Sequence, residues 1–181
     1  MSFEAILNKY RQKSFSERDK GTRFERLMQG YLQTDPTYAD KLEKVWLWEE
    51  FPGRESLGGN DTGIDLVAMT TTGEYWAIQC KCYDEANPID KGSVDSFLAT
   101  SSRKFTNETA NKIAFSNRLW ISTNNNWSSN AEEAIKDQKP PVNRLNLSDL
   151  VQSPVNWEAI ESGKSGKKAL SAEPRSPKKH Q

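Results

Sequence analysis

The chain has 181 residues, of which 28% are charged, and its 25 Lys/Arg and 25 Asp/Glu give a formal net charge of zero. This length suffices for one domain with a substantial core, and no apolar run is long enough to span a bilayer. The single histidine, His180, lies near the chain end, which excludes most catalysis based on a histidine base. Cys80 and Cys82 form a C-x-C that suits a reducing cytoplasm, where we expect the protein, and the ligands of a structural zinc site are missing.

The charge is unevenly distributed along the chain. Residues 163–181 carry six Lys/Arg and one Glu, whereas residues 1–162 carry 19 Lys/Arg and 24 Asp/Glu. The basic, small and proline-bearing segment 163–181 predicts a flexible linker, with the folded domain confined to residues 1–162. Because phosphate contacts dominate DNA affinity, the acidic domain argues against strong autonomous DNA binding.

Helical periodicity and turn residues predict the following elements in chain order. A first helix begins after Ser2, and a polar break over 14–20 precedes a second helix that ends before Asp35-Pro36. A helical turn over 38–44 leads to a strand over 45–51. After a hairpin, we expect a helix from Asp90 and then, in order, a strand over 118–122, a helix to 137, a strand over 142–147 and short helices from 148 and 157. Residues 105–117 remain unassigned.

The hairpin is predicted between residues 63 and 83. Its first strand is apolar on both sides, as in a central strand, and its second is rich in aromatic and β-branched residues. Thr71-Thr72-Gly73 suits a three-residue loop with Gly73 in the left-handed conformation. That loop pairs Thr70 with Glu74, and the same register places Asp65 opposite Gln79.

Three polar residues of this hairpin are expected on one face of the sheet. Side chains alternate along a strand, so Gln79 and Lys81 share a face, and the register adds Asp65 to it. A carboxylate and an amide supply the hard oxygens that Mg²⁺ prefers, and the ammonium suits a phosphate or an attacking water. The alternative is a structural ion pair between Asp65 and Lys81, because a buried carboxylate is costly unless it is paired or bound to a metal.

Glu25 is a further candidate on the second helix. It lies at the edge of the apolar stripe that contains Phe24 and Leu32, from which its carboxylate can reach the sheet. From the pattern alone, the interpretation of Glu25 is a solvated helix glutamate.

The order of these residues resembles the PD-(D/E)xK nucleases, and within them the Mrr branch, where Gln commonly replaces the acidic residue of the second strand. The residues that match are Glu25 in GTRFERLMQGYL, Asp65 in TGIDL, and Gln79 with Lys81 in IQCK. Gly63-Ile64 stands before Asp65 in place of the proline that gives the motif its name. Residues 1 to about 160 are similar to the nuclease domain at the start of single-chain Type ISP restriction–modification enzymes.

This resemblance implies an α/β fold of the restriction-endonuclease type, with a mixed sheet and helices on both faces. It implies Mg²⁺-dependent, sequence-nonspecific hydrolysis of DNA, with Mn²⁺ as a possible substitute. Asp65, Gln79 and the backbone carbonyl of Cys80 would bind the metal, Lys81 would orient or deprotonate the attacking water, and Glu25 would hold a water or a second ion. The linker would lead to an ATP-dependent translocase, followed by a methyltransferase.

Two alternatives remain from the sequence. One is a catalytically silent DNA-binding or docking module with the same fold, against which the intact Asp65 and Lys81 argue. The other is a structure-selective nuclease or junction resolvase, which would require a basic domain body that this chain lacks.

Overall fold

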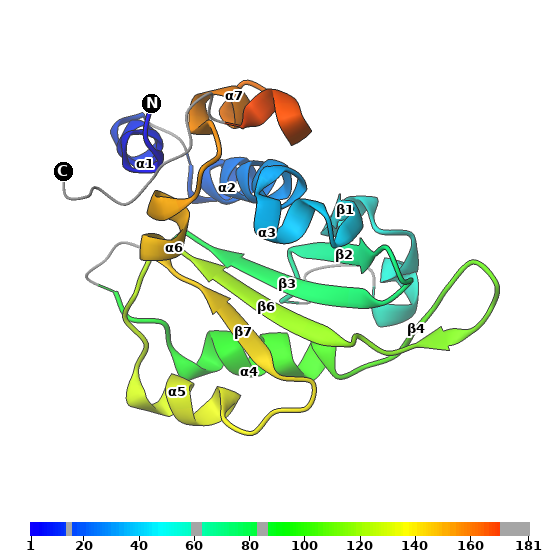
Figure 1. Ribbon diagram of the computed structural model, residues 1–181. Helices are drawn as coiled ribbons and strands as arrows, with labels where there is room; N and C mark the ends of the chain where they lie inside the picture. Colours follow the sequence, from blue (N-terminus) through cyan, green and yellow to red (C-terminus); the bar gives the residue numbers. More distant parts are fainter. Residues whose placement is uncertain (14–15, 59–62, 83–86, 171–181) are drawn as a thin grey trace.

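The computed structural model describes residues 1–13, 16–58, 63–82 and 87–170, and shows a five-stranded mixed sheet between two layers of helices (Figure 1). The sheet order is β1-β2-β3-β6-β7. Its strands are β1 (Leu42–Leu47), β2 (Leu66–Thr70), β3 (Tyr75–Lys81), β6 (Asn117–Ser122) and β7 (Val142–Leu145). This is the predicted mixed sheet with helices on both faces.

The sheet combines an antiparallel and a parallel half. β1, β2 and β3 pair antiparallel, and β3 pairs parallel with β6, which pairs parallel with β7. Parallel neighbours require a crossover connection, and the two crossovers contain α4 (Lys91–Ser101) and α5 (Ser129–Ile135). β3 is therefore the central strand of the sheet and belongs to both the antiparallel and the parallel half.

Each face of the sheet has its own apolar core. One face is covered by α1 (Phe3–Gln12), α2 (Glu17–Thr34), α6 (Leu147–Gln152) and α7 (Trp157–Glu161). The other face is covered by α4 and α5. Ile78 and Cys80 of β3 belong to the first core and Ala77 to the second, as the alternation of side chains along a strand requires.

Several element boundaries differ from those predicted. α2 begins at Glu17, because the Ser16 hydroxyl accepts from the Asp19 backbone N–H and caps the helix within the predicted polar break. The helical turn α3 (Pro36–Ala39) is shorter than predicted, and β1 starts at Leu42 and ends at Leu47. The chain then enters the 3₁₀ turns η1 (Trp48–Glu50) and η2 (Pro52–Leu57), where a strand to residue 51 was expected.

A small second hairpin occupies the segment that the sequence left unassigned. It consists of β4 (Phe105–Thr106) and β5 (Lys112–Ile113), which pair antiparallel and project beside the main sheet in Figure 1. Phe105 is buried in the second core, so this hairpin is anchored at its base.

The predicted linker is wrong for its first residues. The turn η3 (Gly166–Ala169) packs on the domain: Ala169 is fully buried, its carbonyl accepts from the Asn156 N–H, and Leu170 forms a bridge with Val155. The Gly166 N–H also donates to the Thr34 hydroxyl. Because this stretch is basic, its composition did not indicate that Ala169 is buried. Residues 171–181 lie outside the described part of the chain. Among the described residues, no helix has the length and apolar character needed to cross a membrane.

Candidate active site

The β2–β3 hairpin has the predicted register over its paired length. Leu66 pairs with Ile78 and Val67 with Ala77, and the Thr70 N–H donates to the Glu74 carbonyl at 2.8 Å. Gly73 has φ +85°, in the left-handed region that a residue with a side chain rarely adopts. The three-residue loop was therefore correctly predicted. Residue 83, the last of the predicted hairpin, lies outside the described residues.

Asp65 lies one residue before the paired length of β2. The Asp65 N–H donates to the Ile78 carbonyl at 2.9 Å, and one carboxylate oxygen accepts from the Cys80 N–H at 2.9 Å. The expected direct pairing with Gln79 is thus replaced by a side-chain bond to the next residue of β3. This bond holds the Asp65 carboxylate against the segment of β3 that carries Gln79, Cys80 and Lys81.

Glu25 extends from α2 to the same place. Burial and the neighbouring Asp65 carboxylate raise the pKa of Glu25 to about 8, and a hydrogen bond between the two carboxyl groups adds to the shift, with Lys81 acting in the opposite direction. Two carboxyl groups that share a half-buried site cannot both ionise at low cost. The solvated glutamate that the pattern alone suggested does not fit this environment.

Gln79 carries a buried polar atom with no partner in the described part of the chain. The residue is 3% exposed, and its Oε1 accepts no hydrogen bond. Leaving a buried amide oxygen unsatisfied costs about 1–3 kcal/mol, and such atoms are rare in folded proteins. The orphaned oxygen is therefore available to a ligand.

Lys81 lies beside Gln79 at the wall of a cavity of about 590 Å³. No ion pair in the described part of the chain involves Lys81, and a structural Asp65–Lys81 salt bridge is not formed. Burial raises the pKa of the Glu25 carboxyl and that of the Cys80 thiol, and the nearby Lys81 ammonium lowers both. Glu25 thus interacts with both Asp65 and Lys81 near the end of β3, whereas Gln79 lines the cavity together with Lys81.

The donor set suits a hard divalent cation. No group of three or more His, Cys, Asp or Glu side chains clusters among the described residues. Here the carboxyl groups of Glu25 and Asp65 lie near the end of β3 that also carries Gln79, so the candidate donors are two carboxyl groups and one amide oxygen. A cation would relieve the repulsion between the carboxylates and satisfy the orphaned amide oxygen.

One face of α4 was missed by the sequence analysis. Small residues of α4 line the cavity beside Gln79 and Lys81, namely Gly92, Ser93, Ser96, Ala99 and Thr100. The signal was present, because the predicted buried face of this helix, with Val94 and Phe97, leaves Ser96 and Thr100 on another face at helical spacing. Small side chains here keep the approach to Gln79 open.

Comparison with known proteins places this site in a family. The family described as restriction endonuclease, Mrr_cat_2, matches residues 33–167, which include Asp65, Gln79 and Lys81 but not Glu25. A search of curated proteins finds no match. The solved structure of the "ATP-dependent Type ISP restriction-modification enzyme LlaBIII bound to DNA" is similar, with 27% identity and a TM-score of 0.66.

That similarity covers 98% of this chain and 10% of LlaBIII, so the chain spans about a tenth of the length of that protein. The "DNA modification-dependent restriction endonuclease AspBHI" is more distant, at 15% identity and a TM-score of 0.48, over 89% of this chain and 35% of that one. The structure titled "MspJI Restriction Endonuclease in Complex with 27-mer Oligonucleotide" has 16% identity and a TM-score of 0.47, over 81% and 30%. With the matching family covering most of its length and the fold shared with the Type ISP enzyme, the chain belongs to the Mrr_cat_2 restriction endonuclease family.

Proposed function

We propose that this chain is a Mg²⁺-dependent endonuclease domain that hydrolyses DNA phosphodiesters without sequence specificity. The family supports nuclease activity in general. The observation that supports the metal proposal is the buried Oε1 of Gln79, which has no partner in the described part of the chain, on the strand whose end interacts with the carboxyl pair of Glu25 and Asp65. An arrangement built only for stability would satisfy that oxygen and separate those carboxyl groups.

The ligands would be the Asp65 carboxylate, the Gln79 amide oxygen and the backbone carbonyl of Cys80. When bound, Mg²⁺, or Mn²⁺ in its place, supplies positive charge that polarises a phosphate oxygen. The hydrogen bond from the Cys80 N–H fixes the orientation of the Asp65 carboxylate. This preorganisation matters because ligands held in place lose little conformational entropy when the site fills.

Lys81 and Glu25 would act on water and phosphate. Lys81 would orient the attacking water, or deprotonate it in the neutral amine form, and as an ammonium it would offset the negative charge that develops on the phosphorane. Glu25, whose pKa is raised to about 8, would ionise near neutral pH when a cation compensates its charge and would then hold a water or a second ion. The cavity between β3 and α4 gives the substrate strand access to Lys81.

The proposal extends to the protein around this chain. LlaBIII is an ATP-dependent enzyme of which this chain matches a tenth, and by analogy the domain would precede a translocase and a methyltransferase and act on DNA delivered by the motor. Sequence recognition would then belong to another region. The domain boundary would fall after residue 170, since the segment to that residue packs on the domain.

The alternative is a silent module of the same fold that binds DNA or docks within a larger enzyme. Plasmid nicking in Mg²⁺ and Mn²⁺ separates the two, with Asp65→Ala and Lys81→Ala compared with Lys112→Ala, an exposed control on β5. We expect the two site variants to fold and to lose cleavage, while the control cuts. Folded site variants that cut as fast as the parent chain would exclude these residues as the catalytic set.

A further inference from the structure

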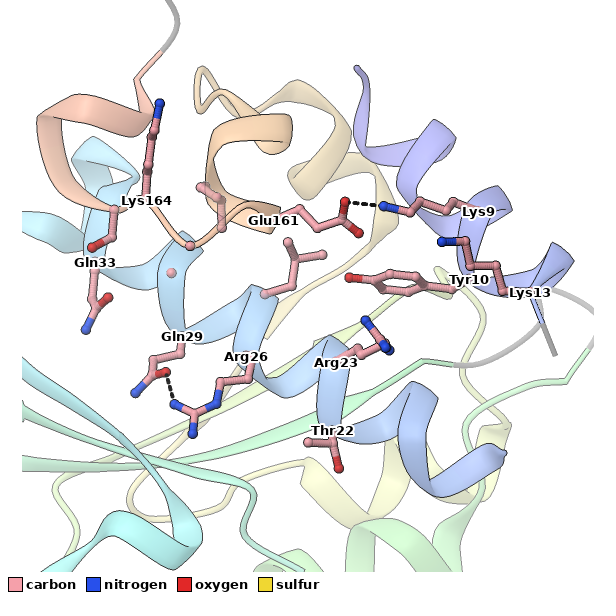
Figure 2. Close-up of a pocket in the computed structure, with 15 residues that line it drawn as sticks. Lys9, Tyr10, Lys13, Thr22, Arg23, Arg26, Gln29, Gln33, Glu161 and Lys164 are labelled. Carbon is pink, nitrogen blue, oxygen red and sulfur yellow. Dashed lines mark hydrogen bonds and ion pairs between the residues drawn. The ribbon is translucent and has the colours of Figure 1, made fainter. Parts of the chain in front are cut away.

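A second cavity, of about 600 Å³, lies between α1, α2 and the segment that follows α7 (Figure 2). Its lining contains five cationic side chains that come from three separate segments: Lys9, Lys13, Arg23, Arg26 and Lys164. Glu161 is the one acidic residue among those that line it. The lining therefore carries a formal charge of +4, in a domain body where Asp/Glu outnumber Lys/Arg by 24 to 19.

The acidic residue in this lining is already engaged. Glu161 forms an ion pair with Lys9 at 2.6 Å. The pKa of the neighbouring Tyr10 is raised mainly by burial and next by Glu161. Arg26 pairs with Glu50 at 3.1 Å and donates to the Gln29 amide oxygen at 3.2 Å. These bonds orient two of the cations of the lining.

The cavity adjoins the candidate active site across one helix. Arg23 and Arg26 flank Glu25 on α2, and successive helix positions point about 100° apart. Glu25 can therefore meet Asp65 while the two arginines line the cavity. An α-helix with its side chains is only about 10–12 Å across, and Tyr10 of the lining interacts electrostatically with Cys82, the residue directly after Lys81.

We propose that this cationic cavity binds backbone phosphates of the DNA whose scissile phosphodiester lies in the candidate active site. The inference rests on the proposed nuclease function and names a second contact surface for the same substrate. Guanidinium and ammonium groups, with the amides of Gln29 and Gln33 and the Thr22 hydroxyl in the lining, are typical phosphate-backbone donors and carry no base specificity. Such contacts would offset the repulsion between DNA and the acidic domain.

The test compares two triple variants with the same change in charge. The cavity variant combines Lys13→Gln, Arg23→Gln and Lys164→Gln, and the control combines Lys41→Gln, Lys44→Gln and Lys112→Gln; all six positions are exposed, and the control residues lie outside the cavity. Fluorescence anisotropy measures the Kd of the 181-residue chain for a 20-base-pair duplex in EDTA, at KCl from 25 to 200 mM, for both variants and the parent.

Each lost phosphate contact lowers the slope of log Kd against log [KCl] by about 0.9 on duplex DNA. We expect the cavity variant to lose roughly 2 to 3 from this slope and to bind at least about tenfold more weakly at 50 mM KCl, while the control changes the slope by less than about 1. Equal losses in both variants would mean that net charge alone acts, and unchanged binding by the cavity variant would also overturn the proposal.

Two further arms separate the ligand source and the two proposals. If 10 mM inorganic phosphate displaces DNA from the parent chain more than KCl of equal ionic strength, the cavity is a small-anion site and the DNA proposal fails. If the cavity variant loses DNA binding and the parent chain cuts no DNA, the nuclease function fails while the cavity assignment stands. If the parent cuts and the cavity variant requires no higher DNA concentration to do so, the cavity assignment fails alone.

Discussion

Replacing Glu25 by Gln should abolish most of the pH dependence of stability between pH 5 and pH 8 in the metal-free protein. The pKa of Glu25 is raised from 4.5 to about 8 by burial and by Asp65. A carboxyl group with a raised pKa in the folded state favours folding below its unfolded pKa, and that contribution is lost as pH rises through the folded pKa. The parent chain should therefore become less stable between pH 4.5 and pH 8.

The size of the effect follows from the pKa. Each pKa unit corresponds to about 1.4 kcal/mol, so a rise from 4.5 to about 8 sets an upper limit of about 5 kcal/mol. Glu25 is half-buried, and screening by solvent reduces the expected loss to about 2–3 kcal/mol. Glu25→Gln keeps the shape of the side chain and removes the charge, so the variant should be more stable than the parent by about 2 kcal/mol at pH 8.5 and similar at pH 5.5.

Urea unfolding in EDTA at several pH values between 5 and 9 measures this directly. Glu49→Gln is the matched control, because Glu49 is exposed and raises the pKa of Glu25 less than burial and Asp65 do. Addition of Mg²⁺ at pH 8.5 should stabilise the parent more than the Glu25→Gln variant, since the cation compensates the ionised pair. Parallel pH profiles for the parent and the variant would refute the argument that the carboxyl pair is held at a cost.

Other outcomes are expected from the same structure. Gln79→Glu should tighten Mg²⁺ binding in calorimetry at pH 8, because the cation prefers a carboxylate to an amide; an unchanged affinity would remove Gln79 from the ligand set. The isolated chain should nick duplex DNA slowly and only at low salt, because its domain body is acidic; fast, salt-resistant cleavage would indicate an autonomous nuclease. Gly73→Ala, at φ +85°, should cost about 1–2 kcal/mol in urea unfolding, and an unaffected midpoint would show that the turn relaxes.

The fold was largely predictable because its strongest signals are local and periodic. The stripe Phe24, Leu27, Met28 and Tyr31 is buried as expected, and Gly73 sets the hairpin register from the turn alone. The predictions failed where tertiary contacts or local hydrogen bonds determine the bounds of an element. The Ser16 cap extends α2, and burial of Ala169 beneath a basic segment depends on α2 and α7, which the local composition does not encode.

The location of the candidate residues was predictable, and their geometry was less so. The alternation of β3 and the register of the hairpin brought Asp65, Gln79 and Lys81 to one place. The hydrogen bond from the Cys80 N–H to the Asp65 carboxylate was not predictable, because it arises where the ladder stops. The cationic cavity was missed as well, since its charges come from segments up to about 150 residues apart and each alone resembles a solvated surface residue.

The amide at position 79 has a physical rationale in the carboxyl pair near the same end of β3. Burial and the nearby Asp65 already raise the pKa of Glu25 to about 8, and Gln79 is only 3% exposed. A glutamate at position 79 would place a third acidic group in that environment, and the metal-free domain would have to bind a further proton or bear more repulsion. The neutral amide avoids this cost and still offers an oxygen. Compared with a glutamate, Gln79 would therefore make the metal-free domain more stable and its affinity for the metal lower. A nuclease domain that folds fully before it binds its cation, and that binds the cation weakly until a phosphate oxygen adds another ligand, would remain inactive until DNA is delivered to it.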